Sequence, residues 1–372
     1  MSIAEFEYTH IPDDAEALRG EVRAFLDEAL ADYGAVDRAY SWMGFDPEFS
    51  RKLGARGWIG MSLPERYGGR GAGLFSRYVV IEELLAAGAP IAAHWMADRQ
   101  SAPLIMRYGT DGQKEKFLPG ICRGEVYFCI GMSEPNAGSD LAAVGTRARR
   151  DGDRWILNGR KLWSTNAHRS HYMIALVRTG DAEQTRHAGL SQFIIDLAAP
   201  GVTIRPIRDM TGDAHFNEIF FDDVELGPDA LIGMEGNGWK QVMAELAIER
   251  SGPERYLSSM ALVNALLDVV GDDPDAMQEH EIGCIVARLY TLRSMSVAVT
   301  SALAAGRDPA WAASCVKDLG TSLEQDIPAI ARKIIDAAPF AEGGGDYGQV
   351  LGLITQMAPS FSLRGGTREI LR

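Results

Sequence analysis

Two short runs in this 372-residue chain hold residue types that could do chemistry. The run MSEPNAGSD, at residues 132–140, combines a hydroxyl, a proline-fixed bend and a small flexible turn. If it follows a strand, its backbone N–H groups and hydroxyls can meet a polar ligand, although an ordinary strand-to-loop corner has the same composition. The run ELAIERSGP, at residues 245–253, places a carboxylate near a helix-breaking Gly-Pro pair.

Glu249 is the candidate general base of the second run. Pro253 has no N–H to bond the carbonyl four residues earlier, so a helix is predicted to be interrupted there, with Glu249 at the kink. A glutamate next to an arginine on a helix is, however, usually part of a solvated face. The residues alone leave both interpretations open.

The elements that must position these runs follow the order helices, strands, helices. Residues 18–30 and 78–87 have the spacing of amphipathic helices, and a loop rich in proline and glycine separates them. The helical spacing returns after Gly238. Between these regions, short apolar runs rich in β-branched and aromatic residues predict strands at residues 127–130, 155–157, 172–177, 193–195 and 219–221.

The closely spaced strands predict a small barrel or sandwich. The dipeptides Asp151-Gly152 and Asn158-Gly159 readily take the positive φ values of hairpin turns. We therefore predict an α+β multidomain fold that comprises an N-terminal α-helical domain, a central small β-barrel and a C-terminal helix bundle. The predicted boundaries are residues 1–126, 127–236 and 237–372.

Composition excludes several classes of function. The formal net charge of -14 and the lack of a basic run argue against nucleic acid as a partner. The cysteines have no CxxC pair, which argues against a disulfide framework or a structural zinc site and favours a reducing compartment. The N-terminus lacks a basic region followed by an apolar stretch, and no uninterrupted apolar run approaches the length of a membrane span. We expect a cytoplasmic protein with no membrane partner and no metal.

The run at residues 132–140 is very similar to the signature of the acyl-CoA dehydrogenase family, which usually reads Ser or Thr, Glu, Pro, any residue, Ala, Gly, Ser, Asp. The run KLWSTN, at residues 161–166, resembles the family's second flavin segment. The resemblance implies FAD as the cofactor, with the Met132 backbone and Ser133 at the flavin pyrimidine ring. It also implies that Trp163 packs beside the isoalloxazine and that Thr165 bonds near flavin N5. Taken alone, Trp163 would be interpreted as a barrel-core aromatic.

The resemblance also implies where the catalytic base lies. In the family the glutamate occupies either a C-terminal loop or a helix position directly before an arginine, and Glu249 with Arg250 matches the helix position. The run LRGGTREILR, at residues 363–372, resembles the family's Tyr-Glu-Gly-Thr segment, but Gly365 replaces the base and has no proton acceptor. Members with a helix-borne base act on branched or long acyl chains, and Gly365 would open the pocket, so both features favour a bulky acyl group.

The implied reaction is FAD-dependent α,β-dehydrogenation of an acyl-CoA thioester to a trans-2-enoyl-CoA. Glu249 would take the α-proton while hydride passes from the β-carbon to flavin N5, and the electrons would pass to an electron-transfer flavoprotein. Ser139 and Arg250 match family positions near the CoA moiety. Thr367 and Glu369 match the adenine side of the flavin site.

Two runs by which family members serve a neighbouring subunit's flavin, Arg-x-x-Phe-Gly and Gln-x-x-Gly-Gly, are absent from the sequence. The corresponding stretches are an acidic turn at residues 271–277, which suits a diphosphate poorly, and the run EGGGD at residues 342–346. The resemblance therefore leaves two assemblies open, the usual homotetramer and an α2β2 heterotetramer with a related chain. It also leaves open an acyl-CoA oxidase-like or nitroalkane oxidase-like flavoenzyme, and a non-catalytic or half-site subunit.

Overall fold

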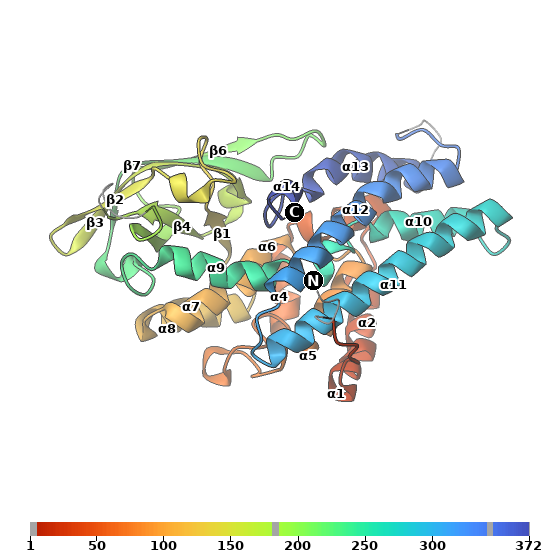
Figure 1. The fold of residues 1–372 in the computed structure, drawn as a ribbon, viewed down its shortest axis with the longest axis horizontal. Helices are drawn as coiled ribbons and strands as arrows, with labels where there is room; N and C mark the ends of the chain where they lie inside the picture. Colours follow the sequence, from red (N-terminus) through yellow and green to blue (C-terminus); the bar gives the residue numbers. More distant parts are fainter. Residues whose placement is uncertain (1–5, 181–185, 341–344, 372) are drawn as a thin grey trace. The chain divides into compact units, whose positions relative to one another are not determined.

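A computed structural model describes residues 6–180, 186–340 and 345–371, and the side chains of residues 244–249 lie outside this description. The order of helices, strands and helices predicted from the sequence is confirmed (Figure 1). The exact boundaries of the three predicted domains stay predictions.

The chain divides into two compact units, a helical unit and a sheet unit. The helical unit combines Met1–Phe45, Ala72–Ile91 and Ala247–Arg372. The sheet unit combines Asp46–Gly71 and Ala92–Leu246.

The helices of both units are mostly short before the sheet and long after it. Their bounds are α1 Asp13–Glu16, α2 Leu18–Ala29, α3 Ala35–Tyr40, α4 Pro47–Ala55, α5 Leu74–Ala86, α6 Ala92–Met96, α7 Ala102–Tyr108, α8 Asp111–Cys122, α9 Gly238–Glu249, α10 Met260–Val270, α11 Ala276–Ala304, α12 Ala310–Ile334, α13 Gly345–Phe361 and α14 Arg368–Leu371.

The strands of the sheet unit are β1 Phe128–Gly131, β2 Arg147–Asp151, β3 Arg154–Thr165, β4 Tyr172–Arg178, β5 Leu190–Asp196, β6 Val202–Ile207 and β7 Phe216–Leu226. Within the described residues they form one sheet in the order β1-β4-β2-β3-β7-β6, and β5 pairs with β4. Strand β5 runs antiparallel along all of β4 and occupies one of its edges. The other edge of β4 is therefore shared by β1 and the start of β2, and both run parallel to β4. The predicted central β domain is therefore confirmed as a curled sheet (Figure 1).

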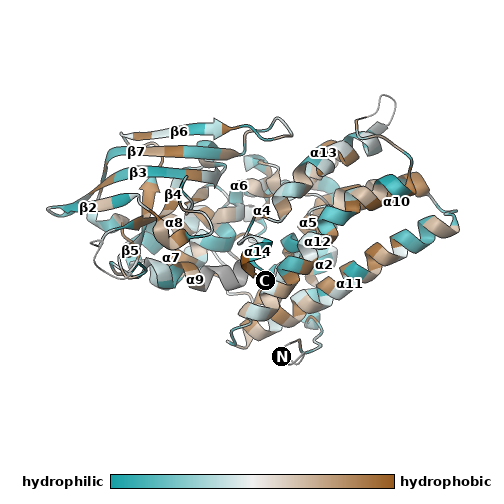
Figure 2. Cartoon of the chain, turned by 45° about the horizontal axis from the view of Figure 1, so that its top comes forward, coloured by the Kyte–Doolittle hydropathy of each residue, from teal (hydrophilic) through white to brown (hydrophobic). Residues whose placement is uncertain are grey.

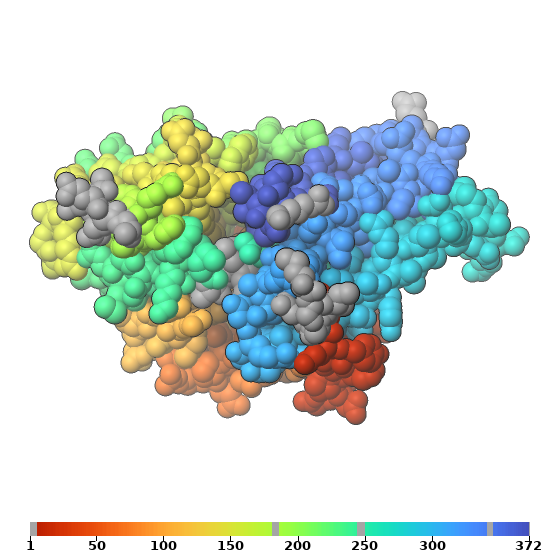
Figure 3. All heavy atoms as spheres, viewed as in Figure 1, coloured from red at the N-terminus to blue at the C-terminus, as the bar shows by residue number. Residues whose placement is uncertain are grey.

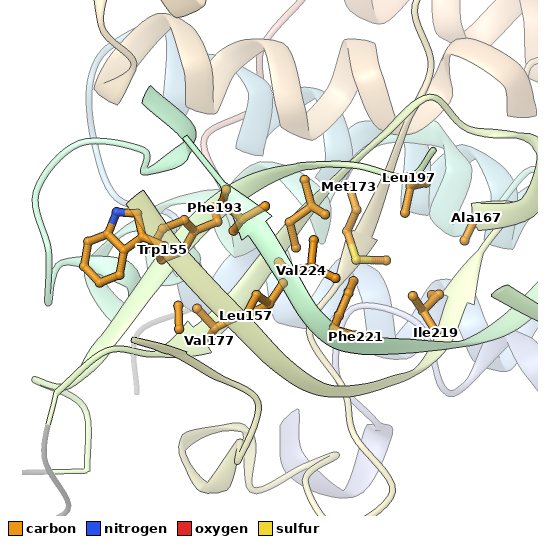
Figure 4. Close-up of a cluster of buried hydrophobic side chains, with 14 of the residues drawn as sticks. Trp155, Leu157, Ala167, Met173, Val177, Phe193, Leu197, Ile219, Phe221 and Val224 are labelled. Atoms are coloured by element: carbon orange, nitrogen blue, oxygen red, sulfur yellow. The ribbon is translucent and has the colours of Figure 1, made fainter. Parts of the chain in front are cut away.

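The core of the sheet unit arises because apolar residues occupy the inward positions of the strands. Along β3, buried Trp155 and Leu157 alternate with more exposed residues, and Phe193 of β5 meets Trp155 edge-on with ring centroids 5.1 Å apart. Figure 4 shows these apolar side chains gathered between the strands. Figure 2 shows the alternating hydropathy along β3 and β7. Lys161 also lies at a buried position of β3 although it is charged.

One of the two predicted hairpin turns is wrong. Asp151-Gly152 begins the turn between β2 and β3, and Gly152 has a φ of +64° as predicted. Asn158-Gly159 instead lies inside β3, at a shift of register against β7. Gly159 has a φ of +142°, and a Cβ there would lie 2.6 Å from the Thr146 Cα, so this glycine permits a bulge and a close backbone approach.

Buried ion pairs hold the helical unit together. Glu82 and Glu83 of α5 are only 6% and 7% exposed. Arg19 of α2 contacts both carboxylates, and Arg293 of α11 donates to Glu82 at 2.7 Å. Because breaking a buried pair leaves an uncompensated charge, the network fixes α2, α5 and α11 relative to one another.

Helix α11 is the one helix of the described chain that is long and apolar enough to cross a membrane. A single such helix is weak support for a membrane span, because the core helix of a globular protein passes the same test. Arg288 of α11 pairs with Asp326 of α12, and Arg293 pairs with Glu82. These contacts make α11 part of the helical unit.

Candidate functional site

The run at residues 132–140 leaves the sheet at the end of β1. Met132 and Ser133 are half-buried, and Glu134 and Ala137 then close a tight turn by exchanging two backbone hydrogen bonds of 2.9 and 3.1 Å. The Ser133 carbonyl accepts from the Leu162 N–H at 2.9 Å. The two predicted flavin runs are therefore bonded directly to each other.

A fully buried lysine ties the first run to β3 and β4. Lys161 Nζ donates to the Glu134 carboxylate at 2.7 Å and to the carbonyls of Met132 and Leu176 at 3.1 and 2.6 Å. The Glu134 carboxylate also accepts from two backbone N–H groups, at 2.7 and 3.0 Å. The buried ion pair of Lys161 and Glu134 thus stabilises the loop that carries Met132 and Ser133.

Burial and the attraction between the two charges shift the pKa of each group in opposite directions. Burial lowers the pKa of Lys161 to about 8, and the Glu134 carboxylate opposes that shift. Burial alone would raise the pKa of Glu134, but Lys161 and the carboxylate's hydrogen bonds together hold this pKa below its usual value. Both groups therefore carry charge at neutral pH.

Trp163 stands at a bulge of β3. The register against β7 shifts between Lys161 and Ser164, and Trp163 has a φ of +63°, which is an outlier for so bulky a residue. The residue is 56% exposed, and its ring meets Phe216 edge-on. The interpretation of Trp163 as a core aromatic is therefore wrong. An exposed ring held in a strained conformation is typical of a binding surface.

Thr165 lies half-buried at the end of β3, and its two neighbours in sequence are buried polar residues. No residue in the described part of the chain bonds to Ser164 Oγ or Asn166 Oδ1, although these residues are only 1% and 5% exposed. A buried polar atom without a partner costs roughly 1–3 kcal/mol. Such atoms in the residues before and after a predicted ligand contact fit a segment that a polar ligand or water completes.

The predicted helix interruption is confirmed in the helical unit. Helix α9 ends at Glu249, and a 3-10 turn begins at Pro253. The side chain of Glu249 lies outside the described residues, so its role as the base stays a prediction. Arg250 is half-buried, and its Nε donates to the Gly365 carbonyl at 3.1 Å. This bond joins the end of α9 to the C-terminal loop, residues 362–367.

Two glycines and a second buried lysine shape the C-terminal loop. Gly365 and Gly366 have φ values of +67° and +92°, which residues with a Cβ adopt only at a cost. Lys317 of α12 is fully buried and donates to the carbonyls of Ser362 and Gly366. Burial, followed by the repulsion of neighbouring arginines, lowers the pKa of Lys317 to about 8.

Arg364 anchors the same loop in the core of the helical unit. It donates to the fully buried carboxylate of Glu324 at 2.6 Å. Its guanidinium also lies over the rings of Trp42 and Phe361, 4.6 Å from each centroid. This anchor was not predicted, because Glu324 belongs to no recognised run and lies 40 residues from Arg364 in the sequence.

The other predicted contact residues lie toward the surface. Ser139 is exposed after the turn of the first run. Thr367 precedes α14, and Glu369 within α14 is exposed. Figure 3 shows the C-terminal residues around α14 on the surface of the helical unit.

The sheet unit therefore brings Met132, Ser133, Trp163 and Thr165 to one end of β1 and β3, while the helical unit carries Glu249, Arg250, Thr367 and Glu369. Sequence reasoning missed Lys161 and Glu134 as supports of the first run. A buried lysine requires a buried partner, but the predicted strand at 155–157 ended before Lys161, and only the structure extends β3 to Thr165.

The chain matches two family models. Residues 12–125 match the acyl-CoA dehydrogenase N-terminal domain, and residues 129–224 match the acyl-CoA dehydrogenase middle domain.

Relatives that carry the family's name agree with these matches. Acyl-CoA dehydrogenase IpdE1 of Mycolicibacterium smegmatis is 31% identical over 96% of this chain and 95% of the relative. Acyl-CoA dehydrogenase IpdE1 of Mycobacterium tuberculosis is 40% identical over 64% of this chain and 63% of the relative. Acyl-CoA dehydrogenase FadE29 of Mycobacterium tuberculosis is 32% identical over 87% and 84%.

Solved structures show the same fold. The Tcur3481-Tcur3483 steroid ACAD superposes with a TM-score of 0.86 at 28% identity, over 98% of this chain and 96% of that one. The ChsE4-ChsE5 complex from Mycobacterium tuberculosis superposes with a TM-score of 0.84 at 26% identity, over 98% and 96%.

Proposed function

The chain belongs to the acyl-CoA dehydrogenase family, a family of oxidoreductases, and we propose that it catalyses the FAD-dependent α,β-dehydrogenation of an acyl-CoA thioester to a trans-2-enoyl-CoA. The electrons removed from the thioester pass to an electron-transfer flavoprotein. The free cysteines Cys122, Cys129, Cys284 and Cys315 are compatible with a reducing cytoplasm, where we place the enzyme.

One observation carries the proposal of FAD, namely that a single segment at the end of β3 exposes the Trp163 ring and buries atoms of Ser164 and Asn166 to which no described residue bonds. The indole offers a large apolar face to an isoalloxazine, and the Thr165 hydroxyl offers a donor at its edge. The Met132 backbone and Ser133 offer polar groups to the pyrimidine ring. The residues present in the sheet unit therefore fit a flavin.

Glu249 removes the α-proton in this proposal. Bound FAD supplies the hydride acceptor. Gly365 has no side-chain acceptor, so the base falls to the glutamate at the end of α9. A general base of this kind typically contributes about 10²–10⁴ in rate.

The remaining residues hold the two ligands. Arg250 and Ser139 contact the CoA moiety, and Thr367 and Glu369 contact the adenine side of FAD. Arg250 is suited to this role because its bond to the Gly365 carbonyl fixes its position at the C-terminal loop.

A bulky acyl group, such as a steroid side chain or a long fatty acyl chain, is the substrate class we propose. The adjacent glycines 365 and 366 leave the C-terminal loop without side chains at the position where many relatives carry the base. The description of one structural relative as a steroid ACAD supports the same class.

We also propose that this chain works in a tetramer, either as four copies or as an α2β2 assembly with a related chain. The lack of the two runs that serve a neighbour's flavin favours the mixed assembly. The structural relative described as the ChsE4-ChsE5 complex is a precedent for pairing two different chains. The usual closed symmetry of homomers favours four copies.

The test is an anaerobic titration of the purified, FAD-supplemented protein with CoA thioesters of short, long and steroid side-chain acids. We expect the visible flavin absorbance to bleach, most rapidly with the bulky thioesters. Protein that retains no flavin absorbance after free FAD is removed would contradict the proposal, and so would bound flavin that none of the thioesters bleaches. Bleaching that is fastest with the short thioester would contradict only the substrate class.

A further inference from the structure

The buried ammonium of Lys161 does more than balance a carboxylate. Of its three acceptors, only Glu134 is charged, and the other two are the carbonyls of Met132 and Leu176. Since the side chain is fully buried, water does not compete for these bonds. The Met132 carbonyl therefore accepts a charge-assisted hydrogen bond in surroundings of low dielectric constant, where such bonds are strong.

The Met132 carbonyl and the Ser133 N–H belong to one peptide group. No described peptide bond is cis, so these two groups point in opposite directions and the N–H faces away from the ammonium. Within the described chain, no residue accepts a hydrogen bond from this N–H. A cation at the carbonyl of an amide polarises the whole group and strengthens its N–H as a donor.

We propose that Lys161 is a positioning residue that orients and polarises the Met132–Ser133 peptide group, so that the site binds reduced FAD in preference to oxidised FAD. This inference rests on the proposed function, which assigns that peptide group to the flavin pyrimidine ring. Reduction adds negative charge to the pyrimidine side of a flavin, and a stronger donor stabilises that charge. Lys161 thereby raises the reduction potential of the bound cofactor.

The charges around Lys161 are compatible with this role. Glu134 is the carboxylate in contact with it, and Arg178 of β4 interacts electrostatically with Glu134. Because burial lowers the pKa of Lys161 only to about 8, most molecules carry the ammonium at neutral pH. The hydrogen bond to Met132 is therefore charged under working conditions.

The experiment measures the reduction potential and the dissociation constant of FAD in the wild-type protein and in Lys161→Met at neutral pH. Hydrogen bonds to charged groups contribute roughly 1.5–3 kcal/mol, and part of this acts through the peptide group. We expect the preference for reduced over oxidised FAD to fall roughly tenfold, which equals a decrease of about 30 mV for a two-electron couple.

Two further variants protect the test against simple loss of folding. The double variant Lys161→Met with Glu134→Gln removes both charges. It therefore leaves no uncompensated carboxylate, and its net charge equals that of the wild-type protein. We expect its potential to be as low as that of the single variant, because both have lost the bond to Met132. Arg154→Met removes a cation from the exposed start of the same strand, where Arg154 pairs with Asp151 and Glu225, and should leave the potential unchanged.

A wild-type potential in both Lys161 variants would overturn the inference, and so would a wild-type potential in the double variant alone, since that result would assign the effect to net charge. An equal decrease in Arg154→Met would overturn it as well. Failure of the wild-type protein to bind FAD would instead refute the proposed function. The two ideas therefore fail in distinguishable ways.

Discussion

At Thr165 the local environment singles out one hydroxyl. Its neighbours in sequence, Ser164 and Asn166, each bury a polar atom to which no described residue bonds, and Trp163 exposes its ring at a strained bulge. Buried polar atoms without partners and a strained backbone both cost free energy, so their presence in one segment calls for a functional explanation. We interpret the end of β3 as a surface that FAD covers.

Thr165→Val removes the hydroxyl and preserves the shape of the side chain. Because a hydrogen bond contributes about 0.5–1.5 kcal/mol net, we expect FAD affinity to fall roughly 2–12-fold, with little change in melting temperature. Titration of the apoprotein with FAD measures this loss. Thr203→Val, at an exposed position of β6 in the same sheet, is the matched control and should bind FAD normally. Wild-type affinity in Thr165→Val would show that this hydroxyl does not contact the flavin.

The residue types in the site could be recognised from the sequence, but their supports could not. Each of the two runs, at 132–140 and at 161–166, is a continuous stretch of sequence, so its motif could be identified without knowledge of the fold. Lys161 and Glu134 meet only because β1 and β3 come together, and Arg364 meets Glu324 across 40 residues. Contacts of this kind depend on tertiary packing, which no local spacing encodes.

At the scale of elements, the C-terminal loop depends on the buried pair of Arg364 and Glu324. Removing only the arginine leaves a fully buried carboxylate without its cation. We expect Arg364→Met to lower the free energy of unfolding by about 3–5 kcal/mol, and Arg364→Met with Glu324→Gln to recover part of that loss. Thermal or denaturant unfolding measures both.

The exposed pair of Arg288 with Asp326 provides the control for this cycle. Arg288→Met should leave the unfolding curve almost unchanged, because exposed ion pairs contribute little. Equal destabilisation by Arg288→Met and Arg364→Met would contradict the role we assign to the buried pair.

Helices and strands could be predicted where the hydrophobic pattern of the sequence is strong. Strands that form mainly because they pair with a neighbouring strand were missed. Strand β4 is a continuous apolar run, and its prediction is confirmed. Strand β2 reads RARRD, with a single apolar residue, and becomes a strand because it pairs with β3. The turn predicted at Asn158-Gly159 was wrong because the same dipeptide also suits a bulge within a strand.

At the scale of the whole molecule, the open question is the assembly. The acidic turn before α11 was interpreted as unsuited to a neighbour's diphosphate, and the structure adds a local role for one of its residues. Asp275 accepts from the N–H groups of Met277 and Gln278 and so caps α11. Of the run at residues 342–346, positions 342–344 lie outside the described residues.

Mass measurement in solution together with FAD stoichiometry, on this chain expressed alone, tests the assembly. The α2β2 proposal predicts less than one FAD per chain and weak activity, both restored when the partner chain is added. A stable homotetramer with one FAD per chain and full activity would contradict the mixed assembly and leave the reaction itself unaffected.

The central claim is that Glu249 at the end of α9 removes the α-proton. The most direct measurement is the rate of anaerobic flavin bleaching by an acyl-CoA that the wild-type protein turns over, compared between wild type and Glu249→Gln. Since the amide cannot accept the proton, we expect the variant to bind FAD normally and to bleach more than about 10²-fold more slowly. Glu279→Gln, at an exposed position of α11, should bleach at the wild-type rate. Bleaching of Glu249→Gln at an unchanged rate would contradict the account.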